Sequence, residues 1–337
     1  MSEPPSKVTY ETYLGLDRLL QCQSLASEKA GERVDEEHLF IIVHQAFELW
    51  FKQILDDLRA VLKTFQLEEF DESKHLAGIA AKLGRITLIQ KLIIGHFEII
   101  ETMPPAIFLN FRKHLRSGSG FESLQFRLIE NTIGLQRGTR KTMNNSDYKG
   151  ILNADQRKIA EQSEEDPSLF DVVAKWLESV FAKYVGDEEK YFEVLQTMLD
   201  RWSKDESIDE HHRGKKDSYT VIFKEAEYES SDKRLSYKAF HGAFLIFLYQ
   251  EEPQFQQANR TLKLIMDVDA QLSKWRHTHV LMVHRMLGKK MGTGGSSGYD
   301  YLMSTNVDDY RVFIELFHMA AFLIPYEYKP SEKPPFK

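Results

Sequence analysis

The sequence predicts an all-α fold, a large helical bundle without a significant sheet. Long segments carry apolar residues at intervals of three or four, which is the spacing of one helix face. The clearest of these segments are 36–65, 78–103 and the stretch from about 255 through 286. No convincing strand is longer than four residues, and strands do not alternate with helices, which argues against a nucleotide-binding α/β sheet.

The composition is that of an ordinary soluble globular protein. Of the 337 residues, 42% are hydrophobic and 28% are charged, which is enough for one large domain or two. The net charge of −7 argues against a nucleic-acid-binding surface. No apolar run approaches the roughly 18 residues of a membrane span. The single cysteine, Cys22, excludes an intramolecular disulfide and favours a reducing, cytoplasmic location.

The N-terminal third predicts a loose end followed by two helices. Residues 1–7 are polar and contain prolines, so we expect a flexible segment. A helix with Tyr10 and Tyr13 on one face should follow, and then a helix over 36–65 with Asp35 as its N-cap. The second helix is apolar around most of its girth, so it should lie near the centre of the fold.

A histidine lies among aromatic residues on the 36–65 helix. His44 has Phe40 one turn before it and Phe47 almost one turn after it. Desolvation by these rings should lower the pKa of His44 below the ordinary value of about 6.5 and keep the ring neutral. A histidine satisfied within the core is the alternative to a ligand-binding residue.

The next helical segment, 78–103, ends at Pro104 and Pro105. The short helix that follows places Phe108 and Arg112 four residues apart, hence on one face. An arginine beside an aromatic ring, just before a Gly/Ser turn, can bind a carboxylate through two parallel hydrogen bonds. The alternative is a solvated arginine whose stem packs on the ring.

The middle of the chain, 138–230, is a more polar and more variable helical region. Further helices are expected at 120–135, 169–185, 188–202, 234–249 and 308–324. We expect residues 8–329 to form a single domain, and the proline-containing tail 330–337 to be disordered.

The long helix that begins near residue 255 carries a histidine on its apolar face. His279 falls within the apolar stripe, whereas His277 and His284 lie on a mixed face. A neutral imidazole on an apolar helix face is what a haem iron needs as an axial ligand. A core histidine satisfied by one hydrogen bond is the alternative. The stripe consists of Ile265, Val268, Leu272, Trp275, Met282 and Met286.

A glycine-rich loop, GTGGSSG, follows this helix at 292–298. It lacks the GxxxxGK and GxGxxG patterns and follows a helix instead of a strand, so it does not predict a phosphate site. The remaining interpretations are a backbone that approaches a ligand closely, with Thr293 offering a hydroxyl, or a flexible connector.

Five segments together resemble the tryptophan 2,3-dioxygenase family: DEEHLFIIVHQAFELWFKQIL, SGFESLQFRLIEN, LSYKAFHGAF, EEPQFQ and WRHTHVLMVHRMLGKKMGTGGSSGYDYL. The resemblance runs from about Thr9 to Tyr328. It implies an all-α homotetramer with haem b, which inserts both atoms of O2 across the indole C2–C3 bond of L-tryptophan. The product would be N-formyl-L-kynurenine, formed in the first step of tryptophan catabolism by the kynurenine pathway.

The resemblance also implies roles for single residues around the haem. His279 would be the proximal ligand of the iron, and Trp275 would lie beside the cofactor. His44 would face the distal side as the catalytic histidine and hydrogen-bond the indole N–H. Phe40 would pack on the indole ring.

Further residues would recognise the amino-acid part of the substrate. Arg112 would pair with the carboxylate, with Phe108 beside it, and Thr293 would meet both the ammonium and the carboxylate. Ser119 and Gly120 would lie at the edge of the pocket over the haem.

The N-terminal tyrosines Tyr10 and Tyr13 would reach the pocket of a neighbouring subunit. No nucleic-acid or membrane partner is expected. Three alternative functions stay open: a haem-binding gas sensor or carrier, a helical scaffold without a cofactor, and an indoleamine-type dioxygenase with a wider substrate range.

Overall fold

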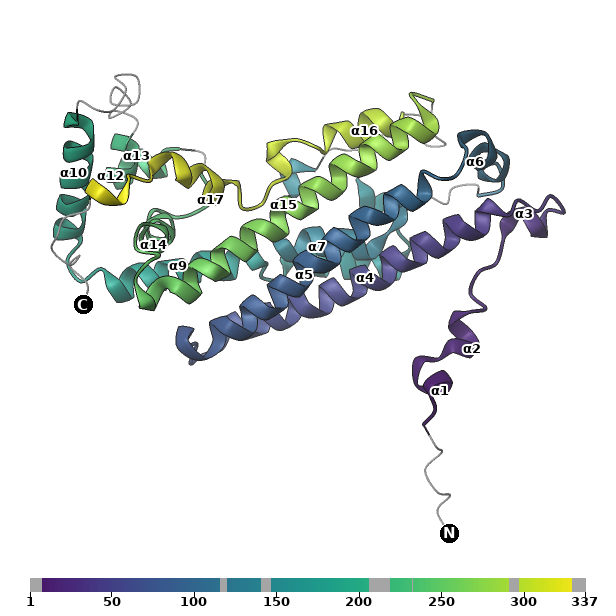
Figure 1. The fold of residues 1–337 in the computed structure, drawn as a ribbon, viewed down its shortest axis with the longest axis horizontal. Helices are drawn as coiled ribbons and strands as arrows, with labels where there is room; N and C mark the ends of the chain where they lie inside the picture. The colour runs from purple at the N-terminus through teal and green to yellow at the C-terminus, as the bar shows by residue number, and fades with distance from the viewer. Residues whose placement is uncertain are drawn as a thin grey trace, which may run out of the picture.

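The computed structural model describes residues 8–115, 120–140, 147–205, 219–231, 233–290 and 297–328. This part of the chain contains helices and no β-strand, which confirms the predicted all-α class. The main helices are α4 (Glu36–Phe65), α5 (Glu72–Ile100), α7 (Leu124–Ile133), α9 (Leu169–Tyr184), α14 (Tyr237–Leu248) and α15 (Pro253–Leu287). Figure 1 shows α4, α5 and α15 side by side along the molecule, with α7 and α9 behind them.

Shorter elements complete the described structure. The other helices are α1 (Tyr10–Leu14), α2 (Leu16–Leu19), α3 (Ala26–Lys29), α6 (Pro105–Arg112), α8 (Ala154–Glu165), α10 (Glu188–Lys204), α12 (Thr220–Phe223), α13 (Glu225–Glu229), α16 (Gly298–Ser304) and α17 (Ile314–His318). The 3₁₀ turns are η1 (Gly120–Glu122), η2 (Arg137–Thr139), η3 (Tyr148–Ile151), η5 (Asp308–Tyr310), η6 (Met319–Phe322) and η7 (Tyr326–Tyr328).

The helix predicted near the N-terminus is broken in two. Gly15 has a φ of 61°, in the left-handed region that glycine tolerates, and separates α1 from α2. Residues 8–24, here called the N-terminal arm, project away from the rest of the molecule in Figure 1. The root of the arm is fixed, because the buried carboxylate of Glu37 accepts hydrogen bonds from the amides of Ala26 and Ser27, at 2.7 and 2.9 Å.

Two predicted helix starts differ from the structure, one in its cap and the other in its position. Helix α4 has the predicted bounds, but Asp35 does not cap it; its carboxylate accepts a hydrogen bond from Arg33 Nε at 2.9 Å. Helix α5 begins at Glu72 instead of residue 78. Its first turn is polar, so apolar spacing did not reveal it, and Asp71 caps it by accepting from the Ser73 amide at 2.9 Å.

The predicted helix at 308–324 is not continuous, and that expectation was wrong. The segment folds as η5, α17 and η6. The amides of Val312 and Phe313 donate to the buried carboxylate of Asp269 on α15, at 3.0 and 3.4 Å, so this backbone bonds to a neighbouring helix between η5 and α17. Helices α8 and α16 were not predicted.

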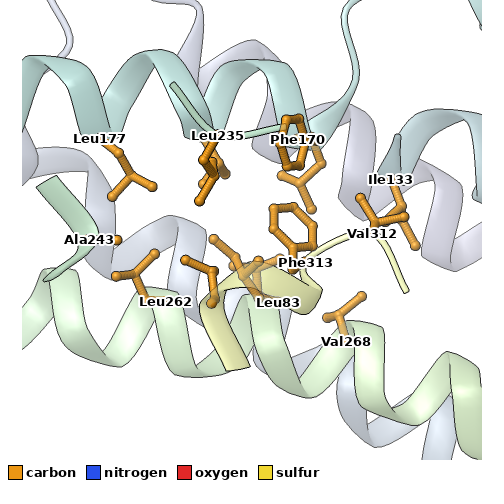
Figure 2. Close-up of a cluster of buried hydrophobic side chains, with 14 of the residues drawn as sticks. Leu83, Ile133, Phe170, Leu177, Leu235, Ala243, Leu262, Val268, Val312 and Phe313 are labelled. Atoms are coloured by element: carbon orange, nitrogen blue, oxygen red, sulfur yellow. The ribbon is translucent and has the colours of Figure 1, made fainter. Parts of the chain in front are cut away.

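The core lies where α5, α9, α14 and α15 meet. Figure 2 shows apolar side chains from these helices and from the C-terminal segment pointing toward one another. Its labelled residues are Leu83, Ile133, Phe170, Leu177, Leu235, Ala243, Leu262, Val268, Val312 and Phe313. Among the described residues no single helix has the length and composition to cross a membrane; only the pair α5 and α6, bent by 93°, passes that test together.

Replacing Gly242 with alanine is expected to lower the free energy of unfolding by about 1–3 kcal/mol or more, which is the usual cost of overpacking a core. A Cβ at Gly242 on α14 would lie 2.0 Å from the Leu177 carbonyl oxygen on α9, so the two helices would have to separate. Urea unfolding measures the effect. Gly78→Ala on α5 is the control, because nothing lies within 4 Å of its Cβ and alanine favours a helix. Equal stability of the two variants would contradict the expectation.

Candidate active site

A cavity of about 630 Å³ is enclosed by α4, α5, α6, α7, α15 and α16. Its size and character suit a small-molecule or cofactor site, which is mostly apolar with a few polar groups. Aromatic side chains form much of its wall: Phe40, Phe47, Phe51, Phe97, Phe108, Phe126 and Trp275. The polar groups on the wall include His44, Glu48, Arg112, Arg127, Glu130 and His279.

His279 lies on α15 with its ring held between aromatic neighbours. Its centroid is 5.5 Å from that of Phe97, in a stacked arrangement, and 5.0 Å from that of Trp275. Burial lowers the pKa of His279 to about 4, so the imidazole is neutral at physiological pH. Its Nδ1 is buried without a hydrogen-bond partner in the part of the chain that the structure describes. A core histidine satisfied by one hydrogen bond, the alternative interpretation, finds no such bond there.

His44 lies on α4, and its tautomer follows from its hydrogen bond. Nδ1 is 2.7 Å from the carbonyl oxygen of Phe40, and a carbonyl only accepts, so Nδ1 carries the proton. Burial lowers the pKa of His44, as its aromatic neighbours predicted, and the ring is therefore neutral. In this tautomer Nε2 has a free lone pair and can accept a hydrogen bond from a ligand. The ring of Phe40 lies 4.0 Å from that of His44, centroid to centroid.

Arg112 is the last residue of α6, and its guanidinium carbon lies 5.9 Å from the centroid of Phe108. The two side chains are neighbours, as their spacing predicted, and both line the cavity. Phe108 also packs on Phe40, with the centroids 5.8 Å apart. Arg112 is half-buried and has no carboxylate within 4.0 Å among the described residues, so its fork of donors is free for an anionic ligand.

The remaining predicted site residues divide into three groups. Gly120, in η1, lines the cavity. Ser119 and Thr293 lie outside the described residues, so the structure does not place them. Tyr10 and Tyr13 lie on the N-terminal arm and do not line the cavity of their own chain; their residues are 77% and 78% exposed.

Sequence reasoning missed a buried ionic cluster in the wall. Glu130 on α7 accepts from Arg127 Nη1 at 3.0 Å and from Arg276 Nη2 at 2.9 Å. Burial alone would raise the pKa of Glu130, but the guanidiniums of Arg127 and Arg276 lower it to about 2. Arg140 Nε also lies 3.7 Å from this carboxylate. Arg127 and Arg276 line the cavity beside the single carboxylate of Glu130, so this part of the wall is positive. The Arg127–Glu130 spacing on a largely apolar helix was the one local signal.

Comparison with known proteins decides which protein family the chain and its site belong to. The family model "Tryptophan 2,3-dioxygenase" matches residues 3–323. The chain belongs to the tryptophan 2,3-dioxygenase family. The tryptophan 2,3-dioxygenase of Mus musculus is 39% identical over 344 residues, covering 96% of this chain and 84% of the relative. That of Xenopus tropicalis is 38% identical over 343 residues, with 96% and 84% covered, and tryptophan 2,3-dioxygenase B of Danio rerio is 38% identical over 345 residues, with 97% and 84% covered.

These findings confirm the family, the dioxygenase class and the place in tryptophan catabolism that the sequence predicted. Members of the tryptophan 2,3-dioxygenase family depend on haem, and the cavity has the features that such a cofactor requires. The neutral imidazole of His279, whose Nδ1 has no hydrogen-bond partner in the described part of the chain, lies on a wall of aromatic rings. The positive wall at Arg127 and Arg276 suits an anionic substituent. The residues present therefore fit a haem.

Proposed function

We propose that this chain is a haem-dependent tryptophan 2,3-dioxygenase that converts L-tryptophan and O2 to N-formyl-L-kynurenine in the cavity described above. The observation that carries the proposal is the neutral imidazole of His279 on an aromatic wall, whose buried Nδ1 has no hydrogen-bond partner among the described residues. When bound, haem b supplies the O2 activation, and the protein supplies binding, orientation and exclusion of water. His279 would hold the iron, with Trp275 beside it.

The substrate indole would lie against Phe40 and His44. In the tautomer fixed by the Phe40 carbonyl, Nε2 of His44 accepts the indole N–H and sets the position of the ring. The lowered pKa of His44 makes it a weak base, and an indole N–H is a very weak acid, so full deprotonation is not required for attack at the ring carbon. His44 is therefore a residue that positions the substrate.

The amino-acid part would be bound by charge. Arg112 would take the carboxylate, with Phe108 packing beside it, and Thr293 would contact the carboxylate and the ammonium. Ser119 and Gly120 would form the edge of the pocket. Selectivity for an amino acid over bare indole follows, because a ligand without a carboxylate leaves the half-buried guanidinium of Arg112 unpaired in the occupied cavity.

The test is turnover of L-tryptophan by the purified chain supplied with hemin and ascorbate under air, followed by the absorbance of formylkynurenine. A haem-loaded chain that forms no product would be a sensor or carrier, and a chain that binds no haem would be a scaffold. Equal turnover of D- and L-tryptophan would indicate an indoleamine-type enzyme with a wider substrate range.

His44→Ala is expected to lower kcat/KM for L-tryptophan by about tenfold without abolishing turnover, because one neutral hydrogen bond contributes about 0.5–1.5 kcal/mol. Product formation per haem is the measurement. Binding of 1-methyltryptophan, which has no indole N–H to donate, should differ less between wild type and variant. Complete loss of activity with haem still bound would show that His44 does more than position the ring.

The assembly is the next part of the proposal: a homotetramer whose N-terminal arms reach neighbouring subunits. Apolar side chains that are left exposed in the described part of the chain support it. The arm exposes Tyr10 and Tyr13, and α5 exposes Leu88, Leu92 and Ile99, which are 66%, 48% and 45% accessible. We also propose that 8–329 is a single catalytic domain and that the protein is cytoplasmic, as its single cysteine predicts.

Deleting residues 1–14 is expected to lower activity by about tenfold or more while haem content changes little. The reason is that Tyr10 and Tyr13 would be lost from the substrate side of a neighbouring pocket, whereas His279 lies in the body of each chain. Absorbance at the Soret band gives haem per chain, and kcat/KM gives the activity. Activity and haem content falling in equal proportion would contradict a role at the substrate side. Tyr10→Ala with Tyr13→Ala in the full chain separates side chains from backbone.

A further inference from the structure

Glu48 is a carboxylate on the cavity wall that the proposed reaction does not use. It lies on α4 one turn after His44. Its Oε1 accepts from the hydroxyl of Ser123 at 2.5 Å, and its Oε2 accepts from the side-chain amide of Gln125 at 2.8 Å. The same amide of Gln125 also donates to the backbone carbonyl of Glu48, at 2.7 Å. Two side chains of another segment, Ser123 and Gln125, are thus held by one residue of α4.

The bound side chains are at the beginning of α7. Ser123 is the N-cap of this helix, because its hydroxyl oxygen accepts from the amide of Phe126 at 3.2 Å while its proton is donated to Glu48. The orientation of the cap is therefore set by Glu48. A shift at Ser123 would move the first turn of α7, which carries Phe126.

Phe126 connects this turn to the proximal side of the cavity. Its ring lies 4.7 Å from that of Trp275, centroid to centroid, and Trp275 lies 5.0 Å from His279. The turn η1, just before Ser123, carries Phe121, whose ring meets that of Tyr301 on α16 edge-on at 4.7 Å. The segment 120–126 thus spans the cavity from α4 to α15 and α16, and Glu48 fastens it on the α4 side.

We infer that Glu48 is a positioning residue, which holds segment 120–126 against α4 and so fixes the spacing between the His44 side and the Trp275 side of the cavity. Hydrogen bonds to a carboxylate are stronger than those to neutral acceptors, which suits a contact that must hold two segments at a fixed distance. Among the described residues no Lys, Arg or His lies within 4.0 Å of this carboxylate. Its side-chain hydrogen bonds therefore come from two neutral groups, the hydroxyl of Ser123 and the amide of Gln125. Only the expected effect on KM for L-tryptophan rests on the proposed function.

The first test needs no activity. Hydrogen exchange of the Phe126 amide and its neighbours should be about tenfold faster, or more, in Glu48→Ala than in wild type, because about 1.4 kcal/mol of opening free energy corresponds to a factor of ten. We expect this in both the haem-free and the hemin-loaded full chain. Glu48→Gln should lie between wild type and Glu48→Ala, because its oxygen can still accept from Ser123. Glu161→Ala, at an exposed carboxylate on α8, is the matched control and should change nothing here.

The second test asks what the fastening does for the substrate. In Glu48→Ala and Ser123→Ala, we expect KM for L-tryptophan to rise by about tenfold while kcat falls less, with haem content retained and the urea midpoint lowered only by the free energy of these local hydrogen bonds. A merely structural role would lower the urea midpoint and haem content and leave KM unchanged, and that result would overturn the inference. Unchanged exchange at Phe126 in Glu48→Ala would do the same.

A double-mutant cycle between two milder substitutions, Glu48→Gln and Gln125→Ala, keeps the inference testable if Glu48→Ala fails to fold. If the two side chains act as one fastening, the double variant should exchange at Phe126 no faster than the more affected single variant. Strictly additive effects would show that they act independently and would contradict the inference. If wild type itself fails to turn over tryptophan, the proposed function fails, while the exchange measurements still decide the role of Glu48.

Discussion

Replacing His279 with alanine is expected to abolish stable haem binding and, with it, all turnover of L-tryptophan. The cavity wall presents this imidazole neutral and without a hydrogen-bond partner among the described residues, so the iron would lose the ligand that the wall offers. Loss of a residue that only hydrogen-bonds a metal ligand lowers metal affinity by about 10–100-fold, so loss of the ligand itself should cost more than about 100-fold.

Titration of the variant with hemin, followed at the Soret band, measures this loss directly. His277→Ala is the matched control, because His277 is an exposed histidine on the same helix and bonds to Asn306 outside the cavity. Free imidazole should partly restore hemin binding to His279→Ala by entering the space left by the side chain. A Soret band of wild-type strength in the variant without imidazole would mean that another side chain holds the iron, and the proposed site would be wrong.

Haem should also protect the fold, and this offers an independent check on the same variant. A ligand that binds only the folded state raises the free energy of unfolding in proportion to the logarithm of its concentration above Kd. Hemin should therefore raise the unfolding midpoint of wild type and leave that of His279→Ala nearly unchanged. This comparison separates a lost ligand from a misfolded chain, because a misfolded variant would already unfold early without hemin.

The sequence could predict what depends on regular spacing along one helix. The bounds of α4 agree with its apolar pattern, and the lowered pKa of His44 follows from rings one turn away. His279 stood out because it interrupts an apolar stripe. Phe108 and Arg112 are neighbours for the same reason, since residues four apart share a helix face.

What escaped prediction depends on contacts between distant segments. Glu48 and Ser123 are 75 residues apart, and Glu130 and Arg276 are 146 apart, so no local pattern pairs them. The break between η5 and α17 arises from Asp269, which lies on another helix. Such pairings become visible only after the packing of α4, α5, α7 and α15 brings the segments together.

The fold places the two histidines on opposite long helices that are joined through a third. Helix α5 packs on both α4 and α15, and its Phe97 contacts Phe47 of α4 and His279 of α15, at 5.3 and 5.5 Å between centroids. A close-packed interior of this kind resists small displacements. The distance between the wall that carries His44 and the wall that carries His279 is therefore set by the same side chains that form the core.

Replacing Arg112 with methionine is expected to lower kcat/KM for L-tryptophan by about 10–100-fold while haem binding stays intact. Methionine keeps an apolar stem beside Phe108 but removes the charge, and hydrogen bonds to a charged group contribute about 1.5–3 kcal/mol. Arg112→Lys should recover only part of the loss, because a lysine keeps the charge without the two parallel donors that match a carboxylate. Lys113→Met is the matched control, since Lys113 is exposed and pairs with Glu32 outside the cavity.

Binding of analogues then assigns the loss to the carboxylate. Tryptamine lacks the carboxylate, so wild type and Arg112→Met should bind it with similar affinity, whereas indole-3-propionate keeps the carboxylate and should bind the variant more weakly. The spectral change of the haem on adding each analogue is the measurement, and it does not depend on turnover. If the variant lost affinity for tryptamine as strongly as for L-tryptophan, Arg112 would be shaping the pocket instead of pairing with the substrate, and the recognition of an amino acid would have to come from other residues.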